Sequence, residues 1–229
     1  GGYQARPLFD AIFPVPPGHY VMATDSHIQI NKYWDFDYPV ADGAAQRRQI
    51  ALRHPRVVSL SLDGNEAAAG RTGPRFAEAF RRAGAAGLRR TVHAGESSGP
   101  EGVRDAIELL GADRIDHGVR AIEDPELVAL LADRRIPLGV CPTSNLKLGV
   151  YAAIDEHPID RLRRAGVAVS INTDDPVLLG ASLEGEYALC SQAFGWSDED
   201  LRALARHSID ASFADADVKA GLLEALARW

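Results

Sequence analysis

The sequence predicts an α/β fold built on a parallel β-sheet. From residue 57 onward, short apolar runs alternate with helical patterns, and successive runs begin 23 to 33 residues apart. Strands of this length followed by helices of about 10 residues are typical of βα units on a parallel sheet. The five predicted strands cover residues 57–60, 90–93, 114–117, 137–141 and 167–171.

The helices between these strands are indicated by periodicity and by capping residues. One helix follows from the i, i+3, i+4, i+7 spacing of Val103, Ala106, Ile107 and Leu110. Another begins at Asp124-Pro125, an N-cap residue followed by a first-turn proline. A third covers residues 159–165 and ends before a glycine.

Two further helices are expected after the last strand. Ser197 and Asp200 form a capping-box pattern ahead of the first of them. The second contains Val218, Leu222 and Leu226 on one face.

The first 45 residues have a different character, with several prolines and a cluster of aromatic residues. Within this region residues 20–30 fit a single strand, and residues 44–53, which begin at its end, fit a helix that leads into the first clear strand. We therefore expect an N-terminal segment, residues 1–45, that forms an edge strand or irregular structure. The α/β domain follows as residues 46–229.

Composition excludes several classes of protein. The 229 residues are 46% hydrophobic and 25% charged, an ordinary globular balance, and the net charge is −7. The sequence lacks the basic excess that is typical of nucleic-acid binders, and no apolar run approaches the roughly 18 residues of a membrane span. Two cysteines cannot build a disulfide framework, which favours a reducing compartment, the cytoplasm.

Polar residues follow nearly every predicted strand. In parallel α/β proteins the carboxyl ends of the strands meet at one edge, where ligands bind. Each polar group alone fits a turn or a cap, but together they bring two histidines, a glutamate and two adjacent aspartates to this edge. They occupy residues 63–66, 93–96, 117–118, 141–145 and 172–176.

These residue types indicate metal-assisted hydrolysis. Imidazole and carboxylate groups suit zinc, which activates water near neutral pH. Glu96 lies three residues beyond His93 and can carry a proton there. Covalent catalysis is less favoured, because Ser144 lacks a Gly-x-Ser-x-Gly elbow and Cys141, which precedes a proline, is interpreted as a buried strand end.

The same motifs resemble the adenosine deaminases of the metal-dependent hydrolase superfamily. They are Ser61-Leu62-Asp63-Gly64-Asn65-Glu66, His93-Ala94-Gly95-Glu96, Arg114-Ile115-Asp116-His117-Gly118, Cys141-Pro142-Thr143-Ser144-Asn145 and Asn172-Thr173-Asp174-Asp175-Pro176. The resemblance covers roughly residues 45–229 and implies a (β/α)8 TIM-barrel type of fold. About five C-terminal βα units account for residues 57–229, and the remaining 56 residues are too few for three more units of about 30 residues. The resemblance therefore predicts an incomplete barrel that lacks its N-terminal strands.

The resemblance also implies a role for each residue of the site. His93 and Asp174 would ligate one zinc ion, and Glu96 would protonate purine nitrogen 1. His117 would position or deprotonate the attacking water, which Asp174 also contacts. These roles imply hydrolytic deamination of adenosine or deoxyadenosine to inosine or deoxyinosine and ammonia.

Two further positions would bind the purine nucleoside. The Gly64 backbone would meet purine nitrogen 3, and the Asp175 carboxylate would hydrogen-bond nitrogen 7. The family's first strand carries a His-x-His pair that supplies two more zinc ligands, and this sequence has no His-x-His. His19, His27 and His54 lie in no matching context and are interpreted as surface or packing residues.

Other readings of the substrate and of the activity stay open. Asp116 stands where many adenosine deaminases have glycine, and an aspartate there is common in relatives that act on free adenine. Asn172-Thr173 and Glu186-Tyr187 look more like the nucleoside branch. A deaminase of free adenine or of another adenine-bearing nucleoside is therefore an alternative, as is an inactive half-barrel remnant or binding module. An incomplete barrel also exposes unpaired strand edges, from which we expect self-association.

Overall fold

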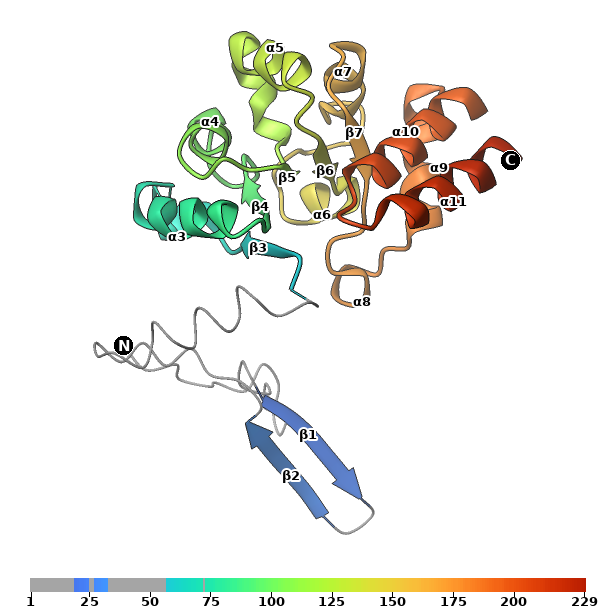
Figure 1. The fold of residues 1–229 in the computed structure, drawn as a ribbon. Coiled ribbons are helices and arrows are strands. Elements are labelled where there is room, and N and C mark those ends of the chain that lie inside the picture. Colours follow the sequence, from blue (N-terminus) through green and yellow to red (C-terminus); the bar gives the residue numbers. More distant parts are fainter. Residues whose placement is uncertain (1–18, 25–26, 33–56, 72) are drawn as a thin grey trace. The chain divides into compact units, whose positions relative to one another are not determined.

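The computed structural model describes residues 19–24, 27–32, 57–71 and 73–229, and the chain divides into two units, residues 1–51 and 52–229. In the first unit, β1 (His19–Thr24) pairs with β2 (His27–Lys32) in antiparallel register (Figure 1). The expectation of one strand over residues 20–30 is wrong, because Thr24 pairs with His27 and the chain reverses between them. The reason is local, since Asp and Ser favour turns and here separate two strand-like halves. The helix expected at 44–53 and His54 lie outside the described residues.

The second unit contains a five-stranded parallel sheet with its strands in sequence order. This confirms the predicted α/β class and its five strands. The strands are β3 (Ser59–Leu62), β4 (Arg89–Ala94), β5 (Arg114–His117), β6 (Leu138–Val140) and β7 (Val169–Ile171). The first strand begins two residues later than expected because its pairing with β4 starts at Ser59, and Val57 and Val58 are 38% and 53% exposed.

Most of the helices lie on the outer side of this sheet (Figure 1). The bounds before β7 are α2 (Glu66–Ala69), α3 (Gly73–Ala85), α4 (Pro100–Glu108), η1 (Val119–Glu123), α5 (Pro125–Asp133), α6 (Pro142–Lys147) and α7 (Ile159–Arg164). Those after β7 are α8 (Pro176–Leu179), α9 (Leu183–Phe194), α10 (Asp198–Ala211) and α11 (Ala216–Ala227).

Capping patterns located the helix starts well. The Asp124 side chain accepts the backbone N–H groups of Glu126 and Leu127, and Ser197 and Asp200 form both bonds of a capping box. The two helices expected after the last strand are present as α10 and α11, but α8 and α9, which were not expected, precede them. Helix α8 is a single turn, and α9 buries only Glu186 and Cys190, so neither has a clear apolar stripe.

The core lies between the strands and the helices that cover them. Branched side chains of β5, β6 and β7 are fully buried, among them Ile115, Leu138 and Val169. They pack in one cluster with buried residues of the helices: Phe80, Val103, Ala106, Leu127, Leu131, Ile159, Leu162 and Leu204. Each fully buried Leu, Ile or Phe contributes about 1.5–3 kcal/mol, so this cluster holds the strand ends firmly in place.

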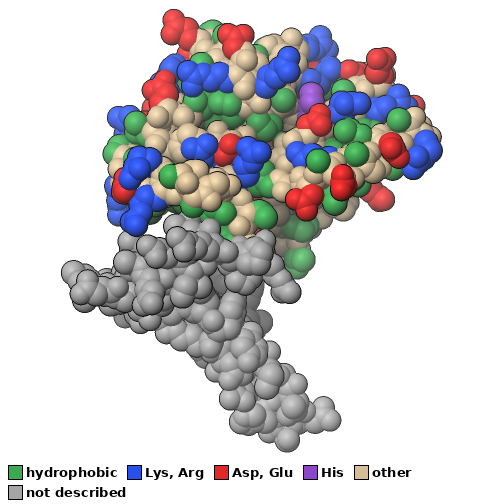
Figure 2. Space-filling model, in the orientation of Figure 1, with side chains coloured by type: hydrophobic (Ala, Val, Ile, Leu, Met, Phe, Trp, Pro, Cys, Tyr) green, Lys and Arg blue, Asp and Glu red, His purple; other side chains and the backbone are tan. Residues whose placement is uncertain are grey.

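The surface carries mixed charge. Figure 2 shows basic and acidic side chains interspersed on the visible face of the second unit, in keeping with many short ion pairs such as Arg120–Glu123. Among the residues that the structure describes, every helix is too short or too polar to traverse a lipid bilayer.

Candidate active site

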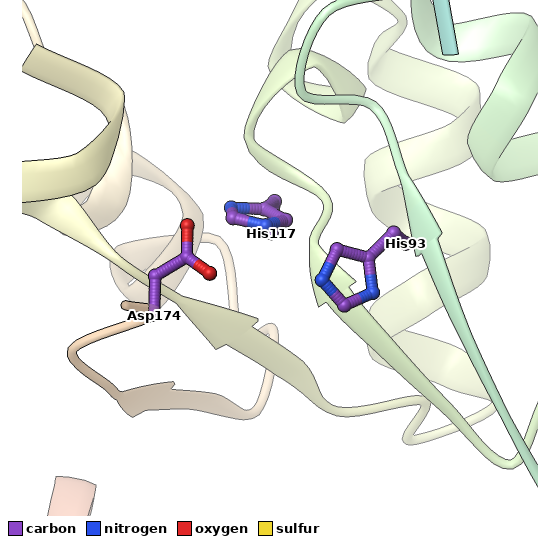
Figure 3. A group of neighbouring side chains, drawn as sticks. All are labelled: His93, His117 and Asp174. Carbon is purple, nitrogen blue, oxygen red and sulfur yellow. The ribbon is translucent and has the colours of Figure 1, made fainter. Parts of the chain in front are cut away.

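Three predicted residues converge at the carboxyl ends of the strands. His93 lies on β4, His117 ends β5, and Asp174 follows β7 (Figure 3). One potential ligand atom from each lies within 4.8 Å of those of the other two. The two imidazole rings meet edge to face, with their centroids 5.0 Å apart. Parallel pairing of β4 with β5, in which Ala94 pairs with His117, brings the two histidines to this edge.

The backbone is strained at two of these three positions. His117 and Asp174 have φ angles of 65° and 59°, in the left-handed region that residues other than glycine rarely adopt. Such conformations persist where the surroundings hold them, and they cluster at functional sites. The Ser144 hydroxyl donates to Oδ2 of Asp174 at 2.6 Å, and the backbone N–H of Gly118 donates to the Ala94 carbonyl at 2.9 Å.

His93 faces acidic neighbours. Its Nδ1 lies 3.2 Å from Oδ1 of Asp63 and 3.7 Å from Oδ2 of Asp116. The Asp63 carboxylate raises the pKa of His93, and His93 in turn lowers the pKa of Asp63. Nδ1 of His93 is buried and forms no well-aligned hydrogen bond, so its lone pair or proton is left without a directed partner.

This donor set fits a metal ion. Imidazole nitrogen and carboxylate oxygen are common zinc ligands, with bond lengths of about 2.0–2.2 Å. Two ligands of a tetrahedral zinc ion would therefore be about 3.4 Å apart. The ligand atoms of His93, His117 and Asp174 lie within 4.8 Å of one another, so those that bind one ion would move somewhat closer together.

Glu96 joins the cluster from the loop after β4. Its Oε1 lies 3.4 Å from Nδ1 of His117 and accepts from Nδ2 of Asn145 at 3.3 Å. Burial, followed by the negative charge of Asp174, raises the pKa of Glu96. The carboxyl group therefore keeps its proton to a higher pH than an exposed glutamate would.

The pKa of His117 is shifted in the opposite direction. Its side chain is almost fully buried. Burial, followed by the charge of His93, lowers its pKa. The two shifts are opposite: the raised pKa of Glu96 favours a proton donor, and the lowered pKa of His117 favours a proton acceptor beside it.

The cluster opens into a cavity of about 510 Å³ whose wall includes His93, Asp116, His117, Cys141, Asn172 and Asp174. Gly64 and Asp175 are exposed and do not line this cavity, although each follows an aspartate that is close to the cluster or in it.

Cys141 is buried, as predicted, and burial raises the pKa of its thiol, which disfavours a thiolate nucleophile.

Several residues of the site were not singled out from the sequence. Glu66 and Asn145 lie inside recognised motifs but had no assigned role, and Ser144 was considered only as a nucleophile. Their side chains bond the loops that carry Glu96 and Asp174. His157 is a lone histidine in a loop, and no sequence pattern connected it with the site.

Comparison with known proteins identifies related deaminases over most of the chain. The adenosine deaminase family matches residues 41–229. The chain is 44% identical over 194 residues to an aminodeoxyfutalosine deaminase of Streptomyces avermitilis, covering 82% of this chain and 54% of that protein. It thus spans about half the length of that relative.

Solved structures agree with this relationship. An adenine deaminase from Arthrobacter aurescens superimposes with a TM-score of 0.75 at 32% identity, over 81% of this chain and 56% of that one. An amidohydrolase from Burkholderia ambifaria, solved with bound zinc, superimposes with a TM-score of 0.70 at 32% identity, over 79% of this chain and 53% of that one. That structure and the His93–His117–Asp174 cluster both support a metal cofactor.

The solved neighbours are TIM-barrel deaminases of which this chain covers about half, so its five strands form part of a barrel, as predicted. The family match extends over most of the chain and includes all five strand-end motifs. The chain therefore belongs to the adenosine deaminase family.

Proposed function

We propose that this chain supplies the acid, the base and part of the metal site of a zinc-dependent deaminase that hydrolyses the amino group of an adenine ring. The single observation that carries the proposal is the convergence of half-buried Glu96 on the three-residue cluster, where it meets buried His117 at one strand edge. Residues that only cap a helix or pack in the core do not need such a pair, in which a carboxyl group of raised pKa contacts an imidazole of lowered pKa.

His93 and Asp174 would hold the zinc ion, with His117 beside it. A bound zinc would supply the Lewis acidity that makes water nucleophilic near neutral pH. Nδ1 of His93 faces Asp63 and Asp116, and the other ring nitrogen is directed toward His117 and Asp174 (Figure 3), which supports this assignment. The Ser144 hydroxyl orients the Asp174 carboxylate by donating to Oδ2.

The remaining residues would move protons. His117, held neutral by burial, would accept a proton from the attacking water. Glu96, whose pKa is raised by burial, would in its protonated form give a proton to purine nitrogen 1. Water would add to carbon 6, and the amino nitrogen would take the proton that His117 had accepted. The bond from carbon 6 to that nitrogen would then break and ammonia would leave, while the hydroxyl proton would return to Glu96 as the carbonyl forms. The products are a 6-oxopurine and ammonia.

The substrate would be adenosine or deoxyadenosine, with Gly64 and Asp175 contacting the purine through nitrogen 3 and nitrogen 7. Another adenine-bearing nucleoside is a second candidate, because the chain is 44% identical to an aminodeoxyfutalosine deaminase. Free adenine is a third, supported by Asp116 and by the likeness to an adenine deaminase. The Asp116 carboxylate accepts from the Thr91 hydroxyl at 2.6 Å beside His93, so it lies where it can affect substrate choice.

The experiment measures ammonia release from adenosine, deoxyadenosine, adenine and aminodeoxyfutalosine. It uses the zinc-supplemented 229-residue chain, alone and co-expressed with the part of the Streptomyces avermitilis relative that this chain does not cover. We call the second preparation the complemented protein.

We expect turnover of at least one substrate by the complemented protein and none by the chain alone, since His93 and Asp174 are fewer than the three or four ligands that zinc sites ordinarily need. Zinc-loaded complemented protein that deaminates none of the four compounds would overturn the proposal. Robust turnover by the chain alone would show instead that it contains further zinc ligands.

A further inference from the structure

A buried histidine lies behind the candidate site and has no role in the proposed chemistry. His157 is 2% exposed, in the loop before α7, and its Nε2 lies 3.1 Å from Oδ1 of Asn145. Asn145 is fully buried at the end of the motif that follows β6. On its other side, Nδ2 of Asn145 reaches Oε1 of Glu96 at 3.3 Å and Nδ1 of His117 at 3.4 Å.

The position of the proton on His157 follows from its second contact. The backbone N–H of Ile159 donates to Nδ1 of His157 at 3.3 Å, so Nδ1 must offer a lone pair. In a neutral ring the proton then sits on Nε2 and is donated to Oδ1 of Asn145. Burial, together with the positive charge of Arg161, lowers the pKa of His157 to about 4, so the ring is neutral at pH 7.

This proton decides which way the Asn145 amide faces. With Oδ1 accepting from His157, Nδ2 donates to Oε1 of Glu96 and lies 3.4 Å from Nδ1 of His117. A flipped amide would place its oxygen against the Glu96 carboxyl group and its NH2 group against a donor on His157. Leaving such buried groups unpaired costs about 1–3 kcal/mol each.

We propose that His157 is a positioning residue: through Asn145, it sets the hydrogen-bond donor that the site presents to Glu96, beside His117. This inference rests on the proposed function for the roles of Glu96 and His117. The Tyr151 ring packs edge to face on His157, with centroids 5.1 Å apart, and helps to hold the imidazole in this orientation.

The first test needs neither activity nor a variant. Histidine ring nitrogens of the 15N-labelled 229-residue chain are observed at pH 7 by long-range proton–nitrogen NMR correlation, which distinguishes the two neutral tautomers and the charged form. We expect His157 as the Nε2–H tautomer. An Nδ1–H tautomer or a doubly protonated ring would overturn the proposal, because Oδ1 of Asn145 would then lose its donor or Nδ1 its lone pair.

The second test compares two variants of His157. His157→Gln offers an amide N–H near the position of Nε2, whereas His157→Leu offers none. We expect the Asn145 side-chain NH2 resonances to keep their shifts and slow exchange in His157→Gln and to lose both in His157→Leu. His207→Leu is the matched control, because His207 bonds the Val169 carbonyl and lines a different cavity, and it should leave these resonances unchanged.

The kinetic test uses the complemented protein. His157→Leu should lower kcat by about 10- to 100-fold with KM changed little, as is typical for residues that orient groups of a metal site. His157→Gln should restore kcat to within about threefold of wild type.

The outcomes separate the two proposals. If the complemented wild type has no activity, the proposed function fails and the tautomer measurement still decides the role of His157. If His157→Gln is as impaired as His157→Leu while both melt at the same temperature, the positioning role is wrong.

Discussion

Oε2 of Glu66 accepts the backbone N–H of Glu96 at 2.8 Å, so a carboxylate at the start of α2 holds the loop that carries the proposed acid. The same carboxylate accepts the N–H of Gly95 at 2.9 Å, the N–H of Ser97 at 3.2 Å and the hydroxyl of Ser98 at 2.7 Å. Hydrogen bonds to a charged group are stronger than neutral ones. The loop after β4 is therefore anchored through one side chain.

Replacing this carboxylate is expected to destabilise the chain. In Glu66→Gln an NH2 group faces backbone N–H donors, so at least one bond is lost and the free energy of unfolding should fall by about 2–3 kcal/mol. Urea denaturation measures this change. Glu224→Gln, at an exposed position of α11, is the control and should change the unfolding free energy by less than about 0.5 kcal/mol. Equal midpoints for the two variants would contradict the anchoring role.

Substitutions at Glu96 and Asp174 should separate catalysis from metal binding. In the complemented protein, Glu96→Gln is expected to keep its zinc and to lose about 10²-fold or more in turnover, because a general acid is removed. Asp174→Ala should lose zinc as well as turnover, because a ligand is removed. Metal content is measured by elemental analysis alongside ammonia release. Equal zinc loss in both variants would show that the assigned roles are wrong.

His157 should make stability depend on pH. Its pKa falls from the ordinary 6.5 to about 4 on folding, so the unfolded chain binds more protons between these values. Stability is therefore complete above about pH 6.5 and falls as the pH drops toward 4, by up to about 3 kcal/mol. Urea denaturation at several pH values measures this for wild type and for His157→Gln. The variant should show a shallower decline over this range, and parallel curves would contradict the assignment.

The isolated chain is expected to self-associate. Within the described sheet, β3 pairs only with β4 and β7 only with β6, so each has an edge of backbone groups available for pairing. Exposed Val57 and Val58 adjoin the first of these edges. Such edges promote intermolecular strand pairing. Light scattering coupled to size-exclusion chromatography should show species larger than 24.7 kDa, and complementation should reduce them. A monomer at all concentrations would contradict this expectation.

Much of the fold could be predicted from patterns that are local in the sequence. Apolar runs located all five strands to within a few residues, and the capping residues Asp124 and Ser197 located two helix starts. Helix α9 was missed because it buries few side chains, and the two paired strands β1 and β2 were predicted as one. Local signals fail where few side chains are buried.

The sequence by itself determined which residues stand at the carboxyl ends of the strands, because the parallel direction of the strands follows from the βα repeat. Only the tertiary structure decided how the loops beyond those ends fold back. It brought Glu66 to the backbone of Glu96 and His157 to Asn145, and it left Gly64 and Asp175 outside the cavity. The physical reason is that periodicity and capping depend on neighbours along the chain, whereas a loop's position depends on packing and hydrogen bonds with distant residues.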